Sequence, residues 1–395
     1  MIQRGLNIIV LGANYYGMMA SSQRIRNLFE PLTYRNEITI SNLVIRDING
    51  RDIVVDGNVN FKNLDYNYKN PFSILSFFFL SAIYLLNQKQ KSKINILYCY
   101  SDPSVENIFI LVFSRLLGYK VVFDIVENQN FIENSQASTL RMRIKRHSMV
   151  RFQKLIPLLG RICFAISPQL VEFCKKLTRG SIPVVLLPIC VNTQKILHYK
   201  LDKVRKANIQ VFYGGSFGHK DGIDFLIEGF EAACMQSIDL ELVLTGRANK
   251  NYEMHLLQRI NSSVMKDKIR YLGCLSNDEY FSVMVNADIL CVTRINSLYA
   301  NSGFPFKLGE YLASGNAIIS TTVGDVSKYL KNKHNAILIK PNSELAIRDA
   351  ILMLYQDKEL RSNIGRSAKE TALKYFSSDL ISNILWENIS KLKNG

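Results

Sequence analysis

Two loops in the second half of the sequence carry residues that can bind phosphate. The longer one, residues 301–315, lies between an apolar strand pattern and a helix pattern and contains Pro305, Lys307 and Glu310. Free backbone N–H groups and the positive end of a helix can hold a diphosphate, and Lys307 can neutralise its charge. Glu310, one turn into the helix, can accept hydrogen bonds from hydroxyl groups. The residues alone also fit an ordinary connection between a strand and a helix.

The second loop, residues 213–222, reads Tyr-Gly-Gly-Ser-Phe-Gly-His-Lys-Asp-Gly and again lies between a strand pattern and a helix pattern. Its glycines permit close approach of the backbone to a ligand, and Lys220 can reach a phosphate. The loop has neither the Walker spacing nor the G-x-G-x-x-G dinucleotide fingerprint. By itself it is therefore weak evidence for any one ligand.

The composition limits the class of partner. The chain has 49 Lys and Arg residues against 33 Asp and Glu, a formal net charge of +16, which favours an anionic partner. An acidic membrane surface and a phosphorylated small molecule both satisfy that charge, whereas no nucleic-acid reader motif is visible and we expect no nucleic acid. The five histidines have no metal-ligand spacing, and the seven cysteines include no Cys-x-x-Cys pair. We expect no metal, and reduced cysteines in a cytoplasmic protein.

The elements that must position the two loops follow a repeated order of strand and helix. Short apolar runs such as 94–100 and 121–126 alternate with helical patterns, which is typical of parallel sheets covered by helices. The 395 residues are enough for two or three domains of about 150 residues. We predict an α/β protein with a Rossmann-like domain at 1–190, a lysine-rich linker at 191–207, a second Rossmann-like domain at 208–376, and a C-terminal helix at 377–395 that packs on the first domain.

In this order the segments resemble the retaining glycosyltransferases of family 4, whose fold is called GT-B. The resemblance covers nearly the whole chain. It implies two Rossmann-like domains facing across a cleft, a nucleotide-sugar donor bound mainly by the second domain, and a glycan or lipid-linked glycan acceptor. It also implies a hexosyltransferase-like activity in polysaccharide or surface-glycan biosynthesis, with no cofactor and no catalytic metal. Four stretches carry the resemblance: the loop 214–222, the strand and turn 242–247, residues 271–273 with 286–288, and the loop and helix 304–315.

The resemblance also implies roles for individual residues. Lys220 would pair with the donor diphosphate, which Gly215 and Ser216 would approach. Glu310 would hold the ribose hydroxyls. In the first domain the loop 12–17 would line the cleft, with Arg24 as a candidate neighbour. Further donor contacts would come from the backbone near Leu275, which would meet the nucleobase, from Gly303, Phe304 and Pro305, which would face the sugar, and from the amides of Lys307 and Leu308, which would receive phosphate oxygens.

Three positions depart from the pattern of that family. Ser302 stands eight residues before Glu310, where relatives commonly have a second glutamate that contacts the sugar. After one strand of the first domain many relatives have a histidine, whereas this chain has Glu127, which can orient an acceptor hydroxyl or be an ordinary exposed loop carboxylate. An arginine that relatives often carry after the first strand of the second domain is missing, and Arg247 and Arg294 are the candidates to replace it.

A retaining transfer must stabilise the leaving diphosphate while the bond to the sugar breaks. Lys220 and the helix start near Lys307 would supply positive charge, and the resemblance implies that the phosphate takes the proton of the acceptor hydroxyl. The predicted catalytic residues are Lys220, Glu310 and Glu127. Two alternatives stay open: a catalytically silent GT-B protein that acts as a glycan-binding or partner subunit, and a nucleotide-sugar 2-epimerase, which would need carboxylates where Ser302 and Gly303 stand.

Two stretches bear on contact with membranes. The run 72–86 is apolar, but its 15 residues fall short of the roughly 20 that span a bilayer, so we expect a buried helix or one that touches a membrane. A basic stretch with interleaved apolar residues is typical of a helix on an anionic surface and also of a solvated face. We predict a cytoplasmic protein, peripheral at the inner membrane face if this stretch binds lipid. The cations of the basic stretch are Arg141, Arg143, Lys145, Arg146 and Arg151.

Overall fold

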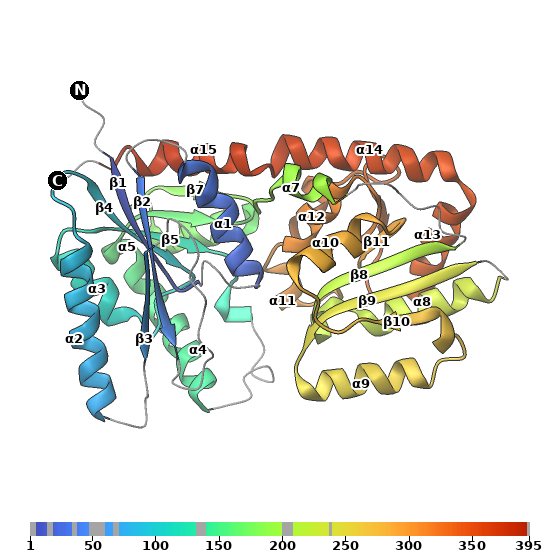
Figure 1. Cartoon of the computed structure of the whole chain (residues 1–395), viewed down its shortest axis with the longest axis horizontal. Helices are drawn as coiled ribbons and strands as arrows, with labels where there is room; N and C mark the ends of the chain where they lie inside the picture. Colours follow the sequence, from blue (N-terminus) through green and yellow to red (C-terminus); the bar gives the residue numbers. More distant parts are fainter. Residues whose placement is uncertain are drawn as a thin grey trace. The chain divides into compact units, whose positions relative to one another are not determined.

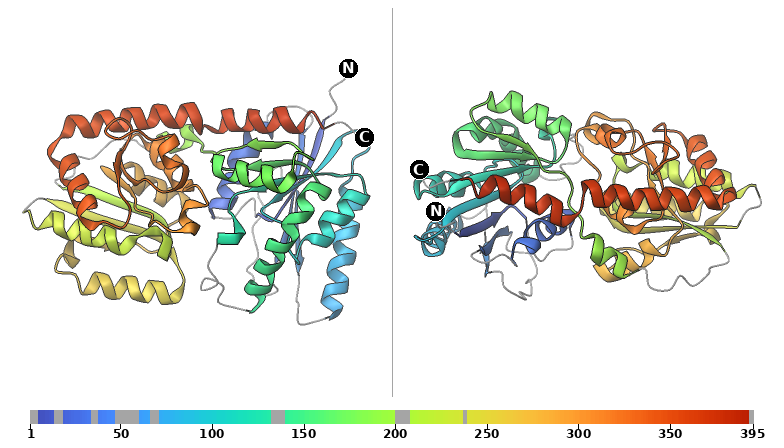
Figure 2. Two further views of the ribbon diagram at one scale, coloured as in Figure 1. Left: turned by 180° about the vertical axis from the view of Figure 1, so that it is seen from behind. Right: turned by 90° about the horizontal axis from the view of Figure 1, so that it is seen from above.

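The chain forms two compact units. Unit 1 comprises Met1–Pro188 with Ser378–Gly395, and unit 2 comprises Ile189–Ser377. Each is a parallel β-sheet covered by helices (Figures 1 and 2), which confirms the prediction of two Rossmann-like α/β domains. The structure is a computed structural model that describes residues 5–13, 19–33, 38–46, 60–65, 71–131, 140–199, 208–236 and 239–392.

Unit 1 is built on a seven-stranded sheet. Its strands are β1 (Leu6–Leu11), β2 (Ile38–Arg46), β3 (Asn60–Asp65), β4 (Ile94–Tyr100), β5 (Lys120–Ile125), β6 (Gly160–Ala165) and β7 (Val184–Leu186), in the order β3-β2-β1-β4-β5-β6-β7. Its helices are α1 (Ala20–Thr33), α2 (Pro71–Gln88), α3 (Ile108–Leu116), α4 (Leu140–Phe152), α5 (Ile156–Leu159), α6 (Pro168–Thr178) and α15 (Ser378–Ile389). Strands β1 and β5 are buried along their whole length, as expected for apolar runs in a sheet covered on both faces.

Unit 2 is built on a six-stranded sheet. Its strands are β8 (Ile209–Phe217), β9 (Leu240–Ala248), β10 (Ile269–Tyr271), β11 (Ile289–Val292), β12 (Ala317–Thr321) and β13 (Ile337–Ile339), in the order β10-β9-β8-β11-β12-β13. Its helices are α7 (Thr193–His198), α8 (Ile223–Cys234), α9 (Lys250–Asn261), α10 (Asn277–Val285), α11 (Leu298–Asn301), α12 (Phe306–Ser314), α13 (Glu344–Gln356) and α14 (Lys358–Tyr375). Apolar residues of the strands and of α8 and α13 form its core.

Both sheets reverse their strand order at one place. The reversal falls between β1 and β4 in unit 1 and between β8 and β11 in unit 2. In open parallel sheets the crossover connections leave toward opposite faces at such a switch point, so a crevice forms outside the carboxyl ends of the two strands. Each unit therefore has one place where its topology favours a ligand site.

The C-terminal helix α15 belongs to unit 1. It packs on α1, and the hydroxyl of Ser382 donates a hydrogen bond to the Leu28 carbonyl oxygen at 2.7 Å. Ile381, Leu385 and Ile389 of α15 are buried. The end of the chain thus completes the core of the unit in which the chain begins.

The boundary between the units differs from the predicted linker at 191–207. Within that range, residues 193–198 form α7, which Asn192 caps by accepting a hydrogen bond from the Lys195 N–H at 2.9 Å. The Val191 N–H donates to the Phe376 carbonyl oxygen at 2.9 Å. This segment therefore opens unit 2 instead of serving as a linker, while residues 200–207 lie outside the described residues.

The apolar run 72–86 lies within α2, an 18-residue helix. Phe77 and Leu85 on one face are buried, whereas Phe72 and Phe79 on another face are 80% and 67% exposed. No helix among the residues that the structure describes is long and apolar enough to cross a membrane. The run is therefore half core and half apolar surface.

Candidate active site

Two glycines bring the backbone and a lysine side chain together at the switch point of unit 2. Gly215, near the end of β8, has φ +137°, and a Cβ added there would lie 2.9 Å from Nζ of Lys307. Gly246 on β9 has φ +147°, and its Cβ would lie 1.6 Å from the Gly215 carbonyl oxygen. Only glycine permits such close packing, so the loop predicted to approach a phosphate lies directly against Lys307.

Lys307, in the first turn of α12, is held in a largely buried position. Its ammonium lies 3.7 Å from the centre of the Tyr213 ring and 3.8 Å from Oδ1 of Asp221. Burial lowers the pKa of Lys307 to about 8; Asp221 opposes the change, whereas the cations of Arg294 and Lys220 add to it. The site therefore gathers positive charge that an anion would stabilise.

Lys220 reaches the same site from the loop after β8. Its ammonium donates to the Tyr299 hydroxyl at 3.0 Å and lies 4.3 Å from the centre of that ring. Gly222, which follows in the left-handed region at φ +65°, lies so close to the end of β11 that a Cβ would be 2.1 Å from the Thr293 carbonyl oxygen. This contact fixes the loop that carries Lys220.

Glu310, one turn further along α12, is buried with its carboxylate hydrogen-bonded. Its Oε2 accepts from the Tyr280 hydroxyl at 3.0 Å, and the side chain is only 5% exposed. Burial raises the pKa of Glu310 to about 7, while the Tyr280 hydrogen bond and Lys307 oppose the rise. Tyr280 comes from α10, whose start is fixed by a capping box of Ser276 and Glu279.

Tyr311, next to Glu310, ties α12 to the glycine-rich loop. Its hydroxyl accepts from the Gly214 N–H at 2.8 Å and donates to the Gly214 carbonyl oxygen at 3.2 Å. Tyr280 and Tyr311 were missed in the sequence, because their partners lie 30 and 97 residues away in the chain. No local pattern marks such residues.

Arg294 and Arg247, the two candidates for the missing arginine, lie in different surroundings. Arg294 follows β11, and its Nη1 lies 3.4 Å from the Ala300 carbonyl oxygen and 3.5 Å from that of Gly303. Its Nε is buried without a hydrogen bond. Arg247 is exposed near the end of β9, opposite Ser216 in the strand register. Of the two arginines, Arg294 is the one whose charge contributes to the lowered pKa of Lys307.

Comparison with known proteins identifies the class of enzyme. Residues 196–371 match the family model for glycosyl transferases group 1. An N,N'-diacetylbacillosaminyl-diphospho-undecaprenol alpha-1,3-N-acetylgalactosaminyltransferase from Campylobacter jejuni is 24% identical, over 78% of either chain. A glycosyltransferase structure from Rickettsia africae superimposes with a TM-score of 0.73 at 17% identity, covering 99% of this chain and 100% of that one. The chain is a GT-B glycosyltransferase.

A relative that matches over a shorter stretch supports the same class of enzyme. An N-acetyl-alpha-D-glucosaminyl L-malate synthase from Bacillus anthracis is 22% identical over 48% of this glycosyltransferase and 46% of its own length. The predictions of a GT-B fold and of a glycosyltransferase are thereby confirmed.

The start of α12 in this glycosyltransferase bears on one predicted phosphate contact. No side chain caps the helix, but the Leu308 N–H donates to the Pro305 carbonyl oxygen at 3.0 Å. In this conformation the donor of the Leu308 amide is used within the first turn, and its predicted contact with a phosphate oxygen stays a prediction. The amide of Lys307 stays a prediction.

The position of the Phe304 side chain bears on the predicted contact with the donor sugar. Its ring is buried against Tyr329 and Phe376, with ring centres 5.4 Å and 5.8 Å away. The side chain is therefore part of the aromatic core and cannot face a sugar. Gly303 and the backbone around Pro305 remain the candidates for that contact, since the Gly303 carbonyl already lies beside Arg294.

Ser302 does not substitute for the glutamate that the family resemblance leads us to expect at its position. It is 2% exposed, and its hydroxyl donates to the Tyr299 carbonyl oxygen at 2.8 Å at the end of α11. Leu275, predicted near the nucleobase, is half-buried directly before the Ser276 cap of α10. That position is compatible with a backbone contact and stays untested.

The site residues predicted in the first domain lie in different surroundings. Arg24 is completely buried, pairs with Asp124 at 2.8 Å and donates to the carbonyl oxygens of Leu187 and Pro188. Four of its five N–H groups are used inside unit 1, so its side chain acts within the core, and its expected place beside the loop 12–17 stays a prediction. Glu127 is half-buried after β5. Most of the loop 12–17 lies outside the described residues.

Proposed function

We propose that this glycosyltransferase transfers a sugar from a nucleotide-sugar donor to a glycan or lipid-linked glycan acceptor, with retention of anomeric configuration. The observation that carries the proposal is the group of three cations, Lys220, Lys307 and Arg294, at one switch point with the buried Glu310. A nucleoside diphosphate offers two phosphates for the cations and ribose hydroxyls for the carboxylate. The Campylobacter relative, whose name includes a diphospho-undecaprenol acceptor, supports a lipid-linked acceptor.

The proposed chemistry follows from charge. As the glycosidic bond breaks, negative charge grows on the leaving diphosphate, and fixed cations in a water-poor site stabilise that charge. Lys220 and Lys307 meet the phosphates, and Glu310, oriented by Tyr280, accepts hydrogen bonds from the ribose. The acceptor hydroxyl attacks from the face that the diphosphate leaves, and a phosphate oxygen takes its proton. Glu127 is proposed to orient that hydroxyl.

Calorimetric titration with UDP, GDP and ADP tests the proposal. We expect one of them to bind, and Lys220→Ala and Glu310→Ala each to weaken binding by roughly 10- to 100-fold, the cost of hydrogen bonds to charged groups. Lys250→Ala, at an exposed lysine of α9, is the control. If none of the three nucleotides binds the wild-type chain, the proposed function is wrong.

We further propose that unit 1 contacts an anionic membrane. Helices α2 and α4 follow β3 and β5, so both begin at the carboxyl edge of one parallel sheet, and Figures 1 and 2 show both starting at the same end of the unit. Phe72, Leu75 and Phe79 of α2 are 65–80% exposed. The first turns of α4 add exposed Leu140, Met142 and Ile144 beside the cations Arg143 and Arg146. Apolar residues with cations nearby suit the surface of an anionic bilayer.

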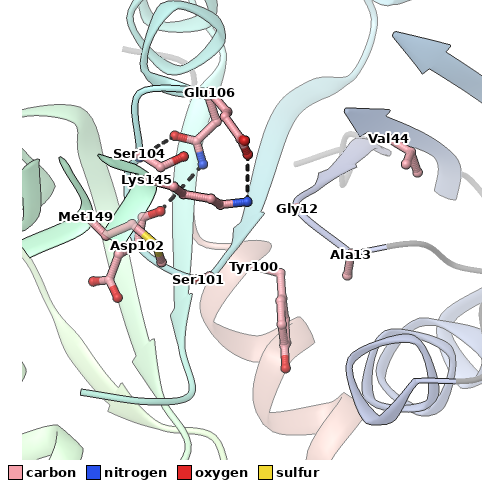
Figure 3. Close-up of a pocket in the computed structure, with 11 residues that line it drawn as sticks. Gly12, Ala13, Val44, Tyr100, Ser101, Asp102, Ser104, Glu106, Lys145 and Met149 are labelled. Atoms are coloured by element: carbon pink, nitrogen blue, oxygen red, sulfur yellow. Dashed lines mark hydrogen bonds and ion pairs between the residues drawn. The ribbon is translucent and has the colours of Figure 1, made fainter. Parts of the chain in front are cut away.

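The other three residues of the predicted basic stretch are not used in this proposal. Lys145 forms an ion pair with Glu106 at 2.6 Å (Figure 3), so it is not part of the proposed membrane surface. Arg151 is exposed near the far end of α4. The side chain of Arg141 lies outside the described residues.

A further inference from the structure

Two charged residues of the cation site are each hydrogen-bonded to a tyrosine. The Lys220 ammonium donates to the Tyr299 hydroxyl at 3.0 Å. The Glu310 carboxylate accepts from the Tyr280 hydroxyl, also at 3.0 Å. A phenol is neutral, so it can fix the direction of a charged side chain without cancelling the charge that a ligand would meet. The family resemblance assigns a role to neither tyrosine.

The Tyr280 ring is held in one position. A Cβ added to Gly214 would lie 2.5 Å from Cε2 of Tyr280, so the ring lies directly against the backbone of the glycine-rich loop. The rings of Phe281 and Phe212 have their centres 5.4 Å and 6.1 Å away. Burial and the negative charge of Glu310 raise the pKa of the Tyr280 hydroxyl, so this group stays protonated. Its hydrogen bond therefore fixes the direction in which Glu310 presents its carboxylate.

Tyr299 is fixed through the backbone of α11. Ser297 caps the first turn of this short helix. At its end the Ser302 hydroxyl donates to the Tyr299 carbonyl oxygen at 2.8 Å. The Asn301 side chain accepts from the Gly324 N–H at 2.8 Å, which ties α11 to the segment after β12. The helix that carries Tyr299 is thus held at both ends.

Lys220 is bonded to this same part of the chain by its backbone. Its carbonyl oxygen accepts from the Ile295 N–H at 3.0 Å, and its ammonium lies 4.3 Å from the centre of the Tyr299 ring. The tyrosine therefore contacts the cation with both its oxygen and its ring. Ser302, which stands where the family resemblance leads us to expect a glutamate, supports Lys220 through Tyr299.

Charged groups that are already in place contribute more to binding, because no side chain has to be ordered when the ligand arrives. We propose that the two tyrosines are positioning residues that serve different parts of the donor. Tyr299 aims Lys220 at the diphosphate. Tyr280 aims Glu310 at the ribose hydroxyls. The inference rests on the proposed function, because it assumes a nucleoside diphosphate in this site.

Calorimetric titration of the full chain with three probes tests the two roles separately. The probes are the nucleoside diphosphate that binds best among UDP, GDP and ADP, its 2′,3′-dideoxy analogue, and the corresponding free nucleoside, which is measured by displacement. We expect Tyr299→Phe to weaken binding of both diphosphates by at least about threefold and to leave the nucleoside unchanged. Tyr280→Phe should weaken the diphosphate and the nucleoside by at least about threefold, because both carry ribose hydroxyls, and leave the dideoxy analogue unchanged.

Tyr355→Phe is the matched control. This tyrosine of α13 also lies in unit 2, and its hydroxyl accepts from the Asp239 N–H at 3.4 Å. Asp239 precedes β9, at the edge of the sheet opposite to the cation site. The control should change none of the three affinities by more than about twofold. Tyr299→Leu, which also removes the ring, should weaken both diphosphates further than Tyr299→Phe does. The thermal unfolding midpoints of all variants confirm that they fold.

The pattern across the probes separates positioning from a general structural role. A structural role would weaken all three probes together, and that result in either tyrosine variant would overturn the proposal for that residue. Unchanged affinities would overturn it as well. Nucleotide binding that still depends on Lys220 and Glu310 would in both cases leave the proposed function standing. If the wild-type chain binds none of the three nucleotides, the proposed function is wrong and this inference is wrong with it.

Discussion

Gly215 shows how a single missing side chain can shape a site. At this residue, near which the family resemblance leads us to expect an arginine, the absent Cβ leaves the space that the Lys307 ammonium occupies. The cation that the loop lacks is thus supplied from α12. Lys220, Lys307 and Glu310 were predictable from the sequence, because lysines and a carboxylate beside glycine-rich turns are a local pattern. The burial of the Ser302 hydroxyl and the use of the Leu308 N–H within α12 could not be predicted, since hydrogen bonds to backbone carbonyl oxygens decide both.

Gly215→Ala should therefore damage nucleotide binding. The new methyl group would meet the Lys307 ammonium and strain a backbone at φ +137°. We expect the affinity for the nucleotide that binds best to fall at least about tenfold, or about 1.4 kcal/mol, in calorimetric titration. Gly180→Ala is the control, because Gly180 also has a positive φ, at +78°, but nothing within 4 Å of its Cβ. Equal affinities of the two variants would contradict the role of Lys307.

The protonation of Lys307 gives a second test at the level of one residue. Its pKa of about 8 in the empty site, below the usual 10.5, means that the ammonium is half deprotonated near pH 8. A bound diphosphate favours the charged form, so its binding at pH 8 should take up protons. Calorimetry in two buffers with different ionisation enthalpies measures this uptake. We expect Lys307→Met to reduce it and Lys250→Met to leave it unchanged; a buffer-independent enthalpy in the wild type would contradict the prediction.

Among the elements, the helices with clear local signals were the predictable ones. Ser167 caps α6, with Pro168 in its first turn, as the sequence indicates. The helix α7 was hidden in a lysine-rich segment, because its stability comes from the Asn192 cap and from packing on α12. The apolar run of α2 predicted either a buried helix or a helix that touches a membrane. In the structure one face of this helix is buried and another is exposed.

The exposed face of α2 makes a prediction at the scale of the element. The triple variant Phe72→Ser/Leu75→Ser/Phe79→Ser should bind anionic phospholipid vesicles at least about tenfold more weakly, because each large apolar side chain contributes about 1.5–3 kcal/mol when fully buried. Co-sedimentation with vesicles measures the change. The matched control is Met254→Ser/Leu257→Ser/Val264→Ser, which removes three exposed apolar residues from unit 2. Equal loss in both variants, or no loss in the first, would rule out α2 as the contact.

At the scale of the whole molecule, the two units share one sheet topology. Each has a parallel sheet with a single reversal of strand order, and in unit 2 the cation site lies at that reversal. The class of the fold was predictable because alternating strand and helix patterns leave few topologies. The assignment of side chains such as Arg24 to core or site was not, because it depends on which strands become neighbours.

The path of the chain adds a final prediction, because unit 1 is closed by a helix that follows all of unit 2. Leu385 of α15 is fully buried, so Leu385→Ala should destabilise unit 1 by about 2–5 kcal/mol. The cation site lies wholly within Ile189–Ser377, so the nucleotide affinity should stay within about twofold of the wild type, less than 0.5 kcal/mol. Native-state hydrogen exchange, read separately for the two units, measures the first effect and calorimetry the second. Leu380→Ala, at a 38% exposed position of the same helix, is the control. A parallel loss of protection and of nucleotide affinity would mean that the units do not fold independently, and the donor site would then depend on the C-terminal helix.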